Sequence, residues 1–184
     1  MDEPHLERSV GQAVIALTVG DLSAFEADAL VNAANSALAG GGGVDGAIHR
    51  RGGPSIMAET LAHHPEGCPT GSAVVSSAGD LKARWVIHAV GPVWRGGWSD
   101  ERQQLASAYR AALRLADEVG ARTIGLPALS AGIYGYPLEE AAEVALATTR
   151  EYLLESSGLQ RATFVLFTPQ TYAVFERALE SLSG

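Results

Sequence analysis

The sequence is poor in cysteine, in basic residues and in long apolar runs. Its single cysteine, Cys68, excludes an internal disulfide and a cysteine-based zinc site. No apolar run approaches the roughly 20 residues of a membrane span. Thirteen Lys and Arg against 21 Asp and Glu give a net charge of −8, which opposes broad nucleic-acid binding because such binding needs a basic face. The start, MDEPHLERSV, resembles neither a secretory signal nor a transit peptide, so we expect a soluble, cytoplasmic protein.

Apolar patterning in the 184 residues predicts strands that alternate with helices. Strands are expected at 12–19, 28–34, 72–78, 84–90, 122–128 and 162–168. Helices are expected at 44–53, 55–64, 99–120, 138–156 and 169–183. This alternation indicates one α/β domain with helices on both faces of the sheet. Residues 1–10 are interpreted as a loosely ordered N-terminal extension.

Two glycine loops each follow a predicted strand: GGGGVDG (40–46) and SAGIYG (130–135). In open α/β sheets, ligands bind beyond the carboxyl ends of the strands, so both loops should lie at a binding edge. The dinucleotide fingerprint needs GxGxxG directly after the first strand and a ribose-binding acid beyond it, and neither is placed correctly here. The first loop also lacks the Lys-Ser/Thr of a P-loop, so the sequence disfavours a Rossmann-type oxidoreductase. Bare backbone N–H groups and a following helix N-terminus can cradle an anion without Lys or Arg. Two such cradles suit a diphosphate.

Three polar residues flank the first loop: Asn35, Asp45 and His49. Asp45 and His49 are four apart on the predicted helix and therefore share a face. Each also has a structural alternative, because Asp45 can cap its helix, His49 can pack in the core, and Asn35 can bond its own backbone in a turn. Cys68, in the turn GCPTG, is interpreted as a packed residue rather than a nucleophile. The residues alone thus indicate a diphosphate-containing ligand beside polar groups.

Three long blocks resemble the MacroD-type macrodomains: GDLSAFEADALVNAANSALAGGGGVDGAIHRRGG, CPTGSAVVSSAGDLKARWVIHAVGPVW and IGLPALSAGIYGYPLEEAA. The resemblance implies a three-layer α/β/α fold around a mixed sheet of about six strands. It also implies a cleft for ADP-ribose. The chain departs from the family at Ala89 and Ala131, where threonine is common, and we expect little loss because backbone N–H groups bind at the second position.

The resemblance also implies roles for individual residues. Asp21 resembles the aspartate that accepts a hydrogen bond from adenine, with Leu22 beside it. Phe167 resembles the aromatic residue that packs on adenine, although on sequence alone it is as easily a core residue. Two loops would hold the diphosphate: Gly41, Gly42, Gly43 and Val44, and Ser130, Ala131, Gly132, Ile133 and Tyr134. Tyr134 would contact the distal ribose, and Asn35, Asp45 and His49 would form the catalytic cluster.

Hydrolytic members of this family cleave the ester between ADP-ribose and acidic side chains, and also O-acetyl-ADP-ribose. A carboxylate leaves without strong acid help, so the reaction needs a positioned water, a weak base and a fixed ribose. The base is either Asp45 or a phosphate oxygen of the substrate. The alternative function is a reader that binds ADP-ribose without cleaving it. We expect a monomer whose partners are ADP-ribose and ADP-ribosylated proteins, with no cofactor and no metal; neighbouring His63 and His64 point apart on a helix.

Overall fold

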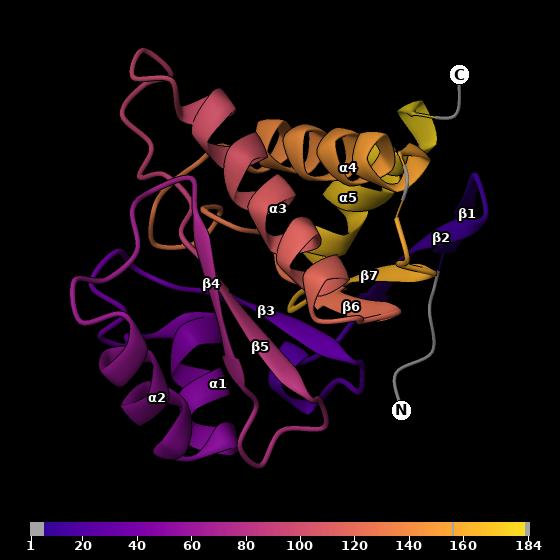
Figure 1. Ribbon diagram of the computed structural model, residues 1–184. Helices are drawn as coiled ribbons and strands as arrows, with labels where there is room; N and C mark the ends of the chain where they lie inside the picture. The colour runs from indigo at the N-terminus through magenta and orange to yellow at the C-terminus, as the bar shows by residue number, and fades with distance from the viewer. Residues whose placement is uncertain (1–5, 156, 183–184) are drawn as a thin grey trace.

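A seven-stranded mixed sheet forms the centre of the computed structural model, which describes residues 6–155 and 157–182 (Figure 1). The strands are β1 (Leu6–Val10), β2 (Ala13–Val19), β3 (Ala29–Ala33), β4 (Ala73–Ser77), β5 (Trp85–Ala89), β6 (Thr123–Leu126) and β7 (Arg161–Leu166). Their order across the sheet is β1-β2-β7-β6-β3-β5-β4. The outer pairs β1–β2 and β4–β5 are antiparallel, whereas the five central strands run parallel. All the central strands therefore end at the same edge.

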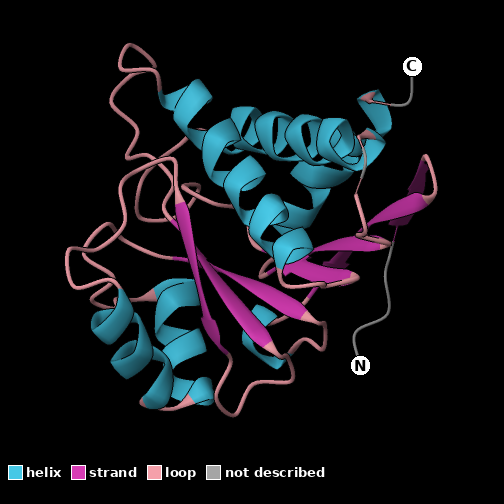
Figure 2. Cartoon of the chain, in the orientation of Figure 1, coloured by secondary structure: helices cyan, strands magenta, loops and turns pink. Residues whose placement is uncertain are grey.

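Helices cover both faces of this sheet, which gives three layers (Figure 2). They are α1 (Gly43–Gly52), α2 (Ser55–His63), α3 (Glu101–Glu118), α4 (Leu138–Leu154) and α5 (Pro169–Ser181), with a short 3-10 helix η1 (Leu22–Ala24). α3, α4 and α5 pack together on one face, and α1 and α2 lie on the other.

The central strands bury alternate residues on opposite faces, as the period of two in a strand requires. In β7, Phe164 belongs to the core under α3, α4 and α5, while the next residue, Val165, belongs to the core under α1 and α2. Ile87 and Val86 of β5 divide in the same way. Because both faces are covered, these strands read as nearly continuous apolar runs in the sequence.

The predicted three-layer α/β/α fold is confirmed, and each of the six expected strands is present. The prediction that residues 1–10 form a loosely ordered extension is wrong for Leu6–Val10, which is the seventh strand, β1. β1 pairs with β2 in register from Leu6 opposite Leu17 to Val10 opposite Ala13. It lies at the sheet edge with Glu7 and Ser9 exposed. Because the strand is largely polar, a search for apolar residues in the sequence does not detect it. Residues 1–5 lie outside the described part of the chain.

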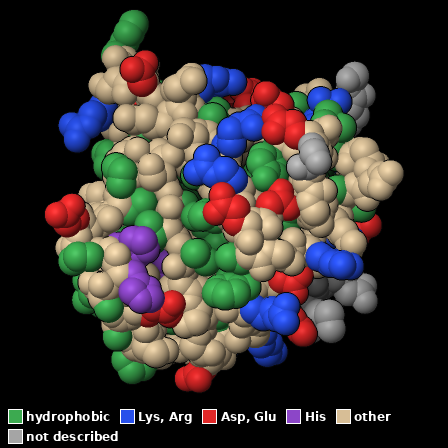
Figure 3. Space-filling model, viewed as in Figure 1, with side chains coloured by type: hydrophobic (Ala, Val, Ile, Leu, Met, Phe, Trp, Pro, Cys, Tyr) green, Lys and Arg blue, Asp and Glu red, His purple; other side chains and the backbone are tan. Residues whose placement is uncertain are grey.

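The surface carries charges of both signs. Acidic and basic side chains are interspersed on the face shown in Figure 3, and no broad basic field covers it. None of the helices in the described ranges is long and apolar enough to cross a bilayer.

Candidate functional site

A cavity of about 640 Å³ opens where the parallel strands end. Its walls come from the segments that follow β2, β3, β6 and β7, together with the first turn of α1. We call this cavity the cleft. Its size is that of a small-molecule site, and its position is the one expected for ligands of an open α/β sheet.

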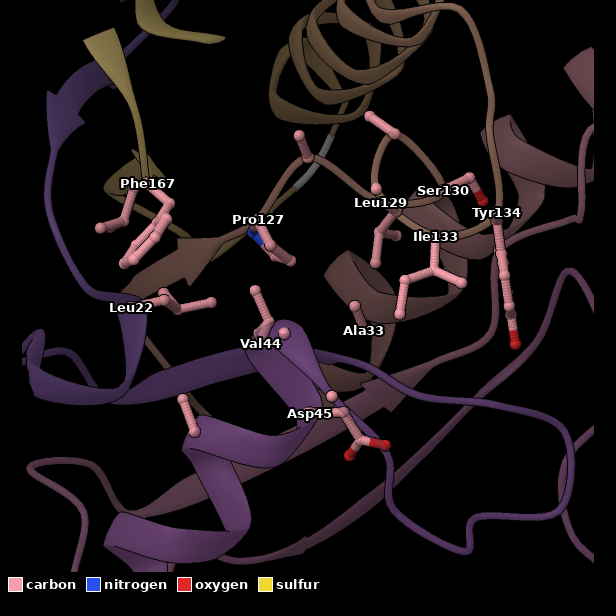
Figure 4. A pocket seen from close by; sticks show the side chains of 18 of the residues that line it. Leu22, Ala33, Val44, Asp45, Pro127, Leu129, Ser130, Ile133, Tyr134 and Phe167 are labelled. Atoms are coloured by element: carbon pink, nitrogen blue, oxygen red, sulfur yellow. The ribbon is translucent and has the colours of Figure 1, made fainter.

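The two ends of the cleft differ in chemistry (Figure 4). Leu22 and Phe167 face one another at one end, whereas Asp45 and Tyr134 lie at the other. Phe167 is 78% exposed, so it is not a core residue but an aromatic wall open to a ligand. The cleft therefore has an apolar, aromatic end and a polar end; we refer to them as the aromatic end and the carboxylate end.

Asp21 lies at the aromatic end, as the N-cap of η1. Its Oδ1 accepts hydrogen bonds from the backbone N–H of Ser23, at 2.9 Å, and from the Ser23 hydroxyl, at 2.7 Å. Arg51 of α1 lies 3.7 Å from Oδ2 and also donates to the Ser23 hydroxyl. Oδ1 thus accepts both hydrogen bonds, whereas Oδ2 has, within the residues that the structure describes, only the longer contact with Arg51. Because 41% of the Asp21 side chain is exposed, Oδ2 can accept a bond from a ligand.

The first glycine loop is closed by the side chain of Asn35. Its Nδ2 donates to the carbonyl of Gly40 at 2.9 Å, and its Oδ1 accepts from the backbone N–H of Ala39 at 3.1 Å. The structural alternative for Asn35, an amide that bonds its own loop, is therefore realised. Because an amide has two donors and two acceptor sites, one of each remains for a ligand in the cleft that Asn35 lines.

Asp45, in the first turn of α1, is a buried carboxylate with one oxygen engaged. Its Oδ1 accepts from Nδ2 of Asn32 at 2.8 Å and lies 3.1 Å from Nε2 of His49. Its Oδ2 lies toward Gly41. A Cβ added to Gly41 would lie 3.6 Å from Oδ2 of Asp45 and 4.0 Å from Nδ2 of Asn35. The orientation thus leaves Oδ2 beside the glycine loop and Asn35, at the carboxylate end.

Behind Asp45 lies a buried chain of polar side chains from three strands. Nδ2 of Asn32 in β3 is 3.1 Å from Nδ1 of His88 in β5, and Nε2 of His88 is 2.9 Å from the hydroxyl of Ser76 in β4. All three residues are at most 1% exposed. Burial, and then the nearby charges of His49 and His64, lower the pKa of His88 to about 3, so its ring is neutral at physiological pH. We call Asn32, His88 and Ser76 the buried triad.

The second glycine loop follows β6, and the side chain of Tyr109 in α3 hydrogen-bonds to the residues just before it. The Tyr109 hydroxyl donates to the carbonyl of Pro127 and accepts from the N–H of Leu129, both at 2.8 Å. Ser130 then takes a left-handed conformation with φ of 65°, which is uncommon for a residue with a side chain. Farther along, the carbonyl of Tyr134 accepts from the N–H of Trp94, which ties this loop to the segment after β5.

The cleft brings together every residue proposed from the sequence to contact ADP-ribose. These lining residues are Asp21, Leu22, Asn35, Gly41, Gly42, Gly43, Val44, Asp45, Ser130, Ala131, Gly132, Ile133, Tyr134 and Phe167. His49 does not line the cleft; it lies behind Asp45, and its ring is nearly parallel to that of His88 with centroids 6.1 Å apart. Of the predicted catalytic cluster, Asn35 and Asp45 can therefore touch a ligand directly.

Sequence reasoning missed the buried triad and Tyr109. The signal for Asn32 and His88 was present, since each is a polar residue inside an otherwise apolar strand, ALVNA and WVIHA. Cys68 is buried, and burial raises the pKa of its thiol, which agrees with a packed residue. Within the described residues, no group of three or more His, Cys, Asp and Glu side chains is arranged to hold a metal ion.

Comparison with known proteins gives a consistent result. A family profile described as the Macro domain matches residues 31–145. A macro domain-containing protein of Caldanaerobacter subterraneus is 51% identical over 170 residues, which cover 91% of this chain and 97% of the relative. The O-acetyl-ADP-ribose deacetylase of Klebsiella pneumoniae is 50% identical over 166 residues, covering 89% of this chain and 94% of that enzyme.

Solved structures agree. The Oceanobacillus iheyensis macrodomain, determined with ADP, has a TM-score of 0.91 at 35% identity and covers 96% of this chain and 95% of its own. The Trypanosoma brucei macrodomain in complex with ADP-ribose has a TM-score of 0.83 at 41% identity, covering 90% of this chain and 68% of its own.

Proposed function

This chain belongs to the macro domain family, and we propose that it is a MacroD-type hydrolase of ADP-ribosyl esters. In this proposal it binds ADP-ribose, releases mono-ADP-ribose from acidic side chains of modified proteins and deacetylates O-acetyl-ADP-ribose. The similarity to the Klebsiella pneumoniae O-acetyl-ADP-ribose deacetylase supports the ester chemistry.

The two ends of the cleft fit the two ends of ADP-ribose. Adenine would lie at the aromatic end, stacked on Phe167 with its amino group toward Oδ2 of Asp21. The diphosphate would lie between the two glycine loops, where the N-terminus of α1 adds a favourable dipole. The distal ribose would then reach the carboxylate end. This arrangement needs no basic residue in either loop, which suits a chain of net charge −8.

The observation that carries the proposal is the orientation of the Asp45 carboxylate. Because Asn32 and His49 engage Oδ1, the lone pairs of Oδ2 remain for a water molecule at the carboxylate end. In the proposed reaction on a modified side chain, water attacks the distal-ribose carbon that carries the ester, and Oδ2 accepts a proton from this water. The bond between that carbon and the ester oxygen breaks, and the target side chain leaves as a carboxylate. Tyr134 and the remaining donor of Asn35 would hold the distal ribose in place.

The variant Asp45→Asn tests this function, because it keeps an oxygen for the Oδ1 contacts and removes the base. Wild-type and variant protein are incubated with proteins mono-ADP-ribosylated on Glu, Ser or Arg, and with O-acetyl-ADP-ribose. We expect wild type to release the Glu-linked label and to hydrolyse the acetyl ester, and the variant to be about 10²- to 10⁴-fold slower.

Calorimetry with ADP-ribose is the control, and we expect binding of both proteins to be similar. Binding by wild type without release of any label would instead indicate a reader. Near-wild-type turnover by Asp45→Asn would place the base on a substrate phosphate, and release of Ser- or Arg-linked label alone would contradict the ester mechanism.

A further inference from the structure

We propose that His88, which lies outside the cleft, is a positioning residue for the proposed hydrolysis: it holds the Asn32 amide so that Nδ2 faces Oδ1 of Asp45. This inference rests on the proposed function, since it concerns how the catalytic carboxylate is kept in its working orientation. Sheet pairing brings the residues together, because β3 and β5 are parallel neighbours with Asn32 directly opposite His88.

The hydrogen bonds of the buried triad form a chain with one direction. The Asn32 Nδ2 group has two protons and only donates, so Nδ1 of His88 must accept and its proton must sit on Nε2. Nε2–H then donates to the Ser76 hydroxyl, whose own proton goes to the carbonyl of Ser77 at 2.9 Å. Ser76 thereby selects the tautomer of His88 that accepts from Asn32.

This direction fixes the amide of Asn32. One Nδ2 proton goes to His88 and the other to Asp45, while Oδ1 has no hydrogen-bond partner among the described residues. If the amide turned by 180°, Oδ1 would face both a carboxylate oxygen and an acceptor nitrogen, which is repulsive on both sides. A neutral His88 with Nδ1 unprotonated therefore allows only the amide orientation that donates to Asp45.

The consequence reaches the cleft through Asp45. Asn32 and His49 both contact Oδ1, so the Asp45 carboxylate cannot rotate about its Cβ–Cγ bond without breaking two contacts. Oδ2 is consequently kept toward Gly41 and Asn35. Removal of the acceptor at position 88 would leave Asn32 free to turn, and Asp45 would lose one of the two donors that orient it.

Two substitutions at position 88 separate positioning from packing. His88→Phe keeps a ring in the strand but has no acceptor, whereas His88→Asn places an amide oxygen near the position of Nδ1. Ile87→Ala is the matched control, because Ile87 is equally buried in the same strand but faces the opposite side of the sheet. Each variant is assayed for kcat and KM on Glu-linked mono-ADP-ribosylated protein and for the Kd of ADP-ribose.

We expect His88→Phe to lower kcat by about 10- to 100-fold, the usual effect of losing a residue that orients a functional group, with the Kd of ADP-ribose nearly unchanged. His88→Asn should recover most of this loss, and Ile87→Ala should keep the wild-type kcat even where it lowers the melting temperature. In the Asp45→Asn background, His88→Phe should cause no further loss, because both changes remove the same contribution.

Full activity of His88→Phe would overturn the inference, as would an equal loss in the presence and absence of the Asp45 carboxylate. If His88→Phe fails to fold, Ser76→Ala tests the same chain by releasing Nε2–H of His88, and it should lower kcat by a smaller factor; an unchanged kcat would refute the proposal. Absence of hydrolysis by wild type is a different result, which refutes the proposed function itself.

Discussion

The two hydrogen bonds of Tyr109 should link global stability to ligand affinity. In Tyr109→Phe the ring stays between β7 and α3, so the apolar contacts with Phe164 are kept and only the hydroxyl is lost. The carbonyl of Pro127 and the N–H of Leu129 then lose their partner in a buried place. Burial also raises the pKa of Tyr109, so the native group is a neutral phenol that can both donate and accept.

The magnitude follows from these two orphaned backbone groups. A buried donor or acceptor without a partner costs about 1–3 kcal/mol, and some relaxation is expected in a loop, so Tyr109→Phe should lower the free energy of unfolding by about 2–4 kcal/mol. Since the same bonds hold the start of the second glycine loop, the Kd of ADP-ribose should rise as well. Urea denaturation and calorimetry measure the two quantities.

A matched control is Tyr152→Phe in α4. Its hydroxyl donates to the carboxylate of Asp117 at 2.6 Å, and neither residue lines the cleft. That variant should lose stability without a change in affinity. A loss below about 0.5 kcal/mol in Tyr109→Phe would refute the reasoning, because that is the range of an ordinary surface change. An unchanged Kd would show that the second loop does not depend on Tyr109.

Two substitutions in the cleft and one pH dependence that arises from the buried triad give further tests. Gly41→Ala should leave stability unchanged and lower kcat, because its methyl group would make ordinary contacts but lie between Oδ2 of Asp45 and Asn35; a normal kcat would place the reaction elsewhere. Phe167→Ala should weaken ADP-ribose binding by about 1–3 kcal/mol, as loss of a base-stacking ring does, without lowering the melting temperature of the free protein. Because the pKa of His88 falls from 6.5 to about 3 on folding, the stability that its neutral ring contributes is complete above pH 6.5 and is lost as the pH falls toward 3. As the pH falls over this range, the free energy of unfolding of wild type should therefore decrease by up to about 1.4 kcal/mol per pH unit more than that of His88→Asn. Denaturation at a series of pH values measures both, and the same pH dependence in the two proteins would contradict the assignment.

The sequence predicted the parts of this fold that depend on local pattern. Central strands such as ATFVLF are apolar because both faces of the sheet are covered, and helix 101–118 shows its 3.6-residue period because one face stays in solvent. Strand β1 was missed because an edge strand pairs through its backbone and needs few apolar side chains. The positions of the glycine loops were predictable because each follows a strand, and parallel strands end together.

The buried triad and the place of His49 could not be predicted in the same way. Asn32, Ser76 and His88 are separated by up to 56 positions, and only the order β3-β5-β4 in the sheet makes them neighbours. His49 shares a helix face with Asp45, as expected, but whether that face meets the cleft or the core depends on the rotation of α1. In this orientation the backbone of α1 comes close to the first glycine loop, since a Cβ at Gly46 would meet the carbonyl oxygen of Gly41 at 2.7 Å.

The two ends of the cleft are built differently, and this has a consequence for how variants should behave. At the carboxylate end the key side chain is Asp45, which is buried and accepts a hydrogen bond from Asn32 of the buried triad. At the aromatic end, Phe167 is largely exposed to solvent. Ordering exposed side chains costs entropy that a ligand must offset, so substitutions there should change affinity more than turnover. Substitutions in the buried triad reach the cleft through the orientation of Asp45, so they should change turnover more than affinity. If both kinds of substitution changed kcat and Kd together, the two ends would be coupled through the glycine loops and not independent.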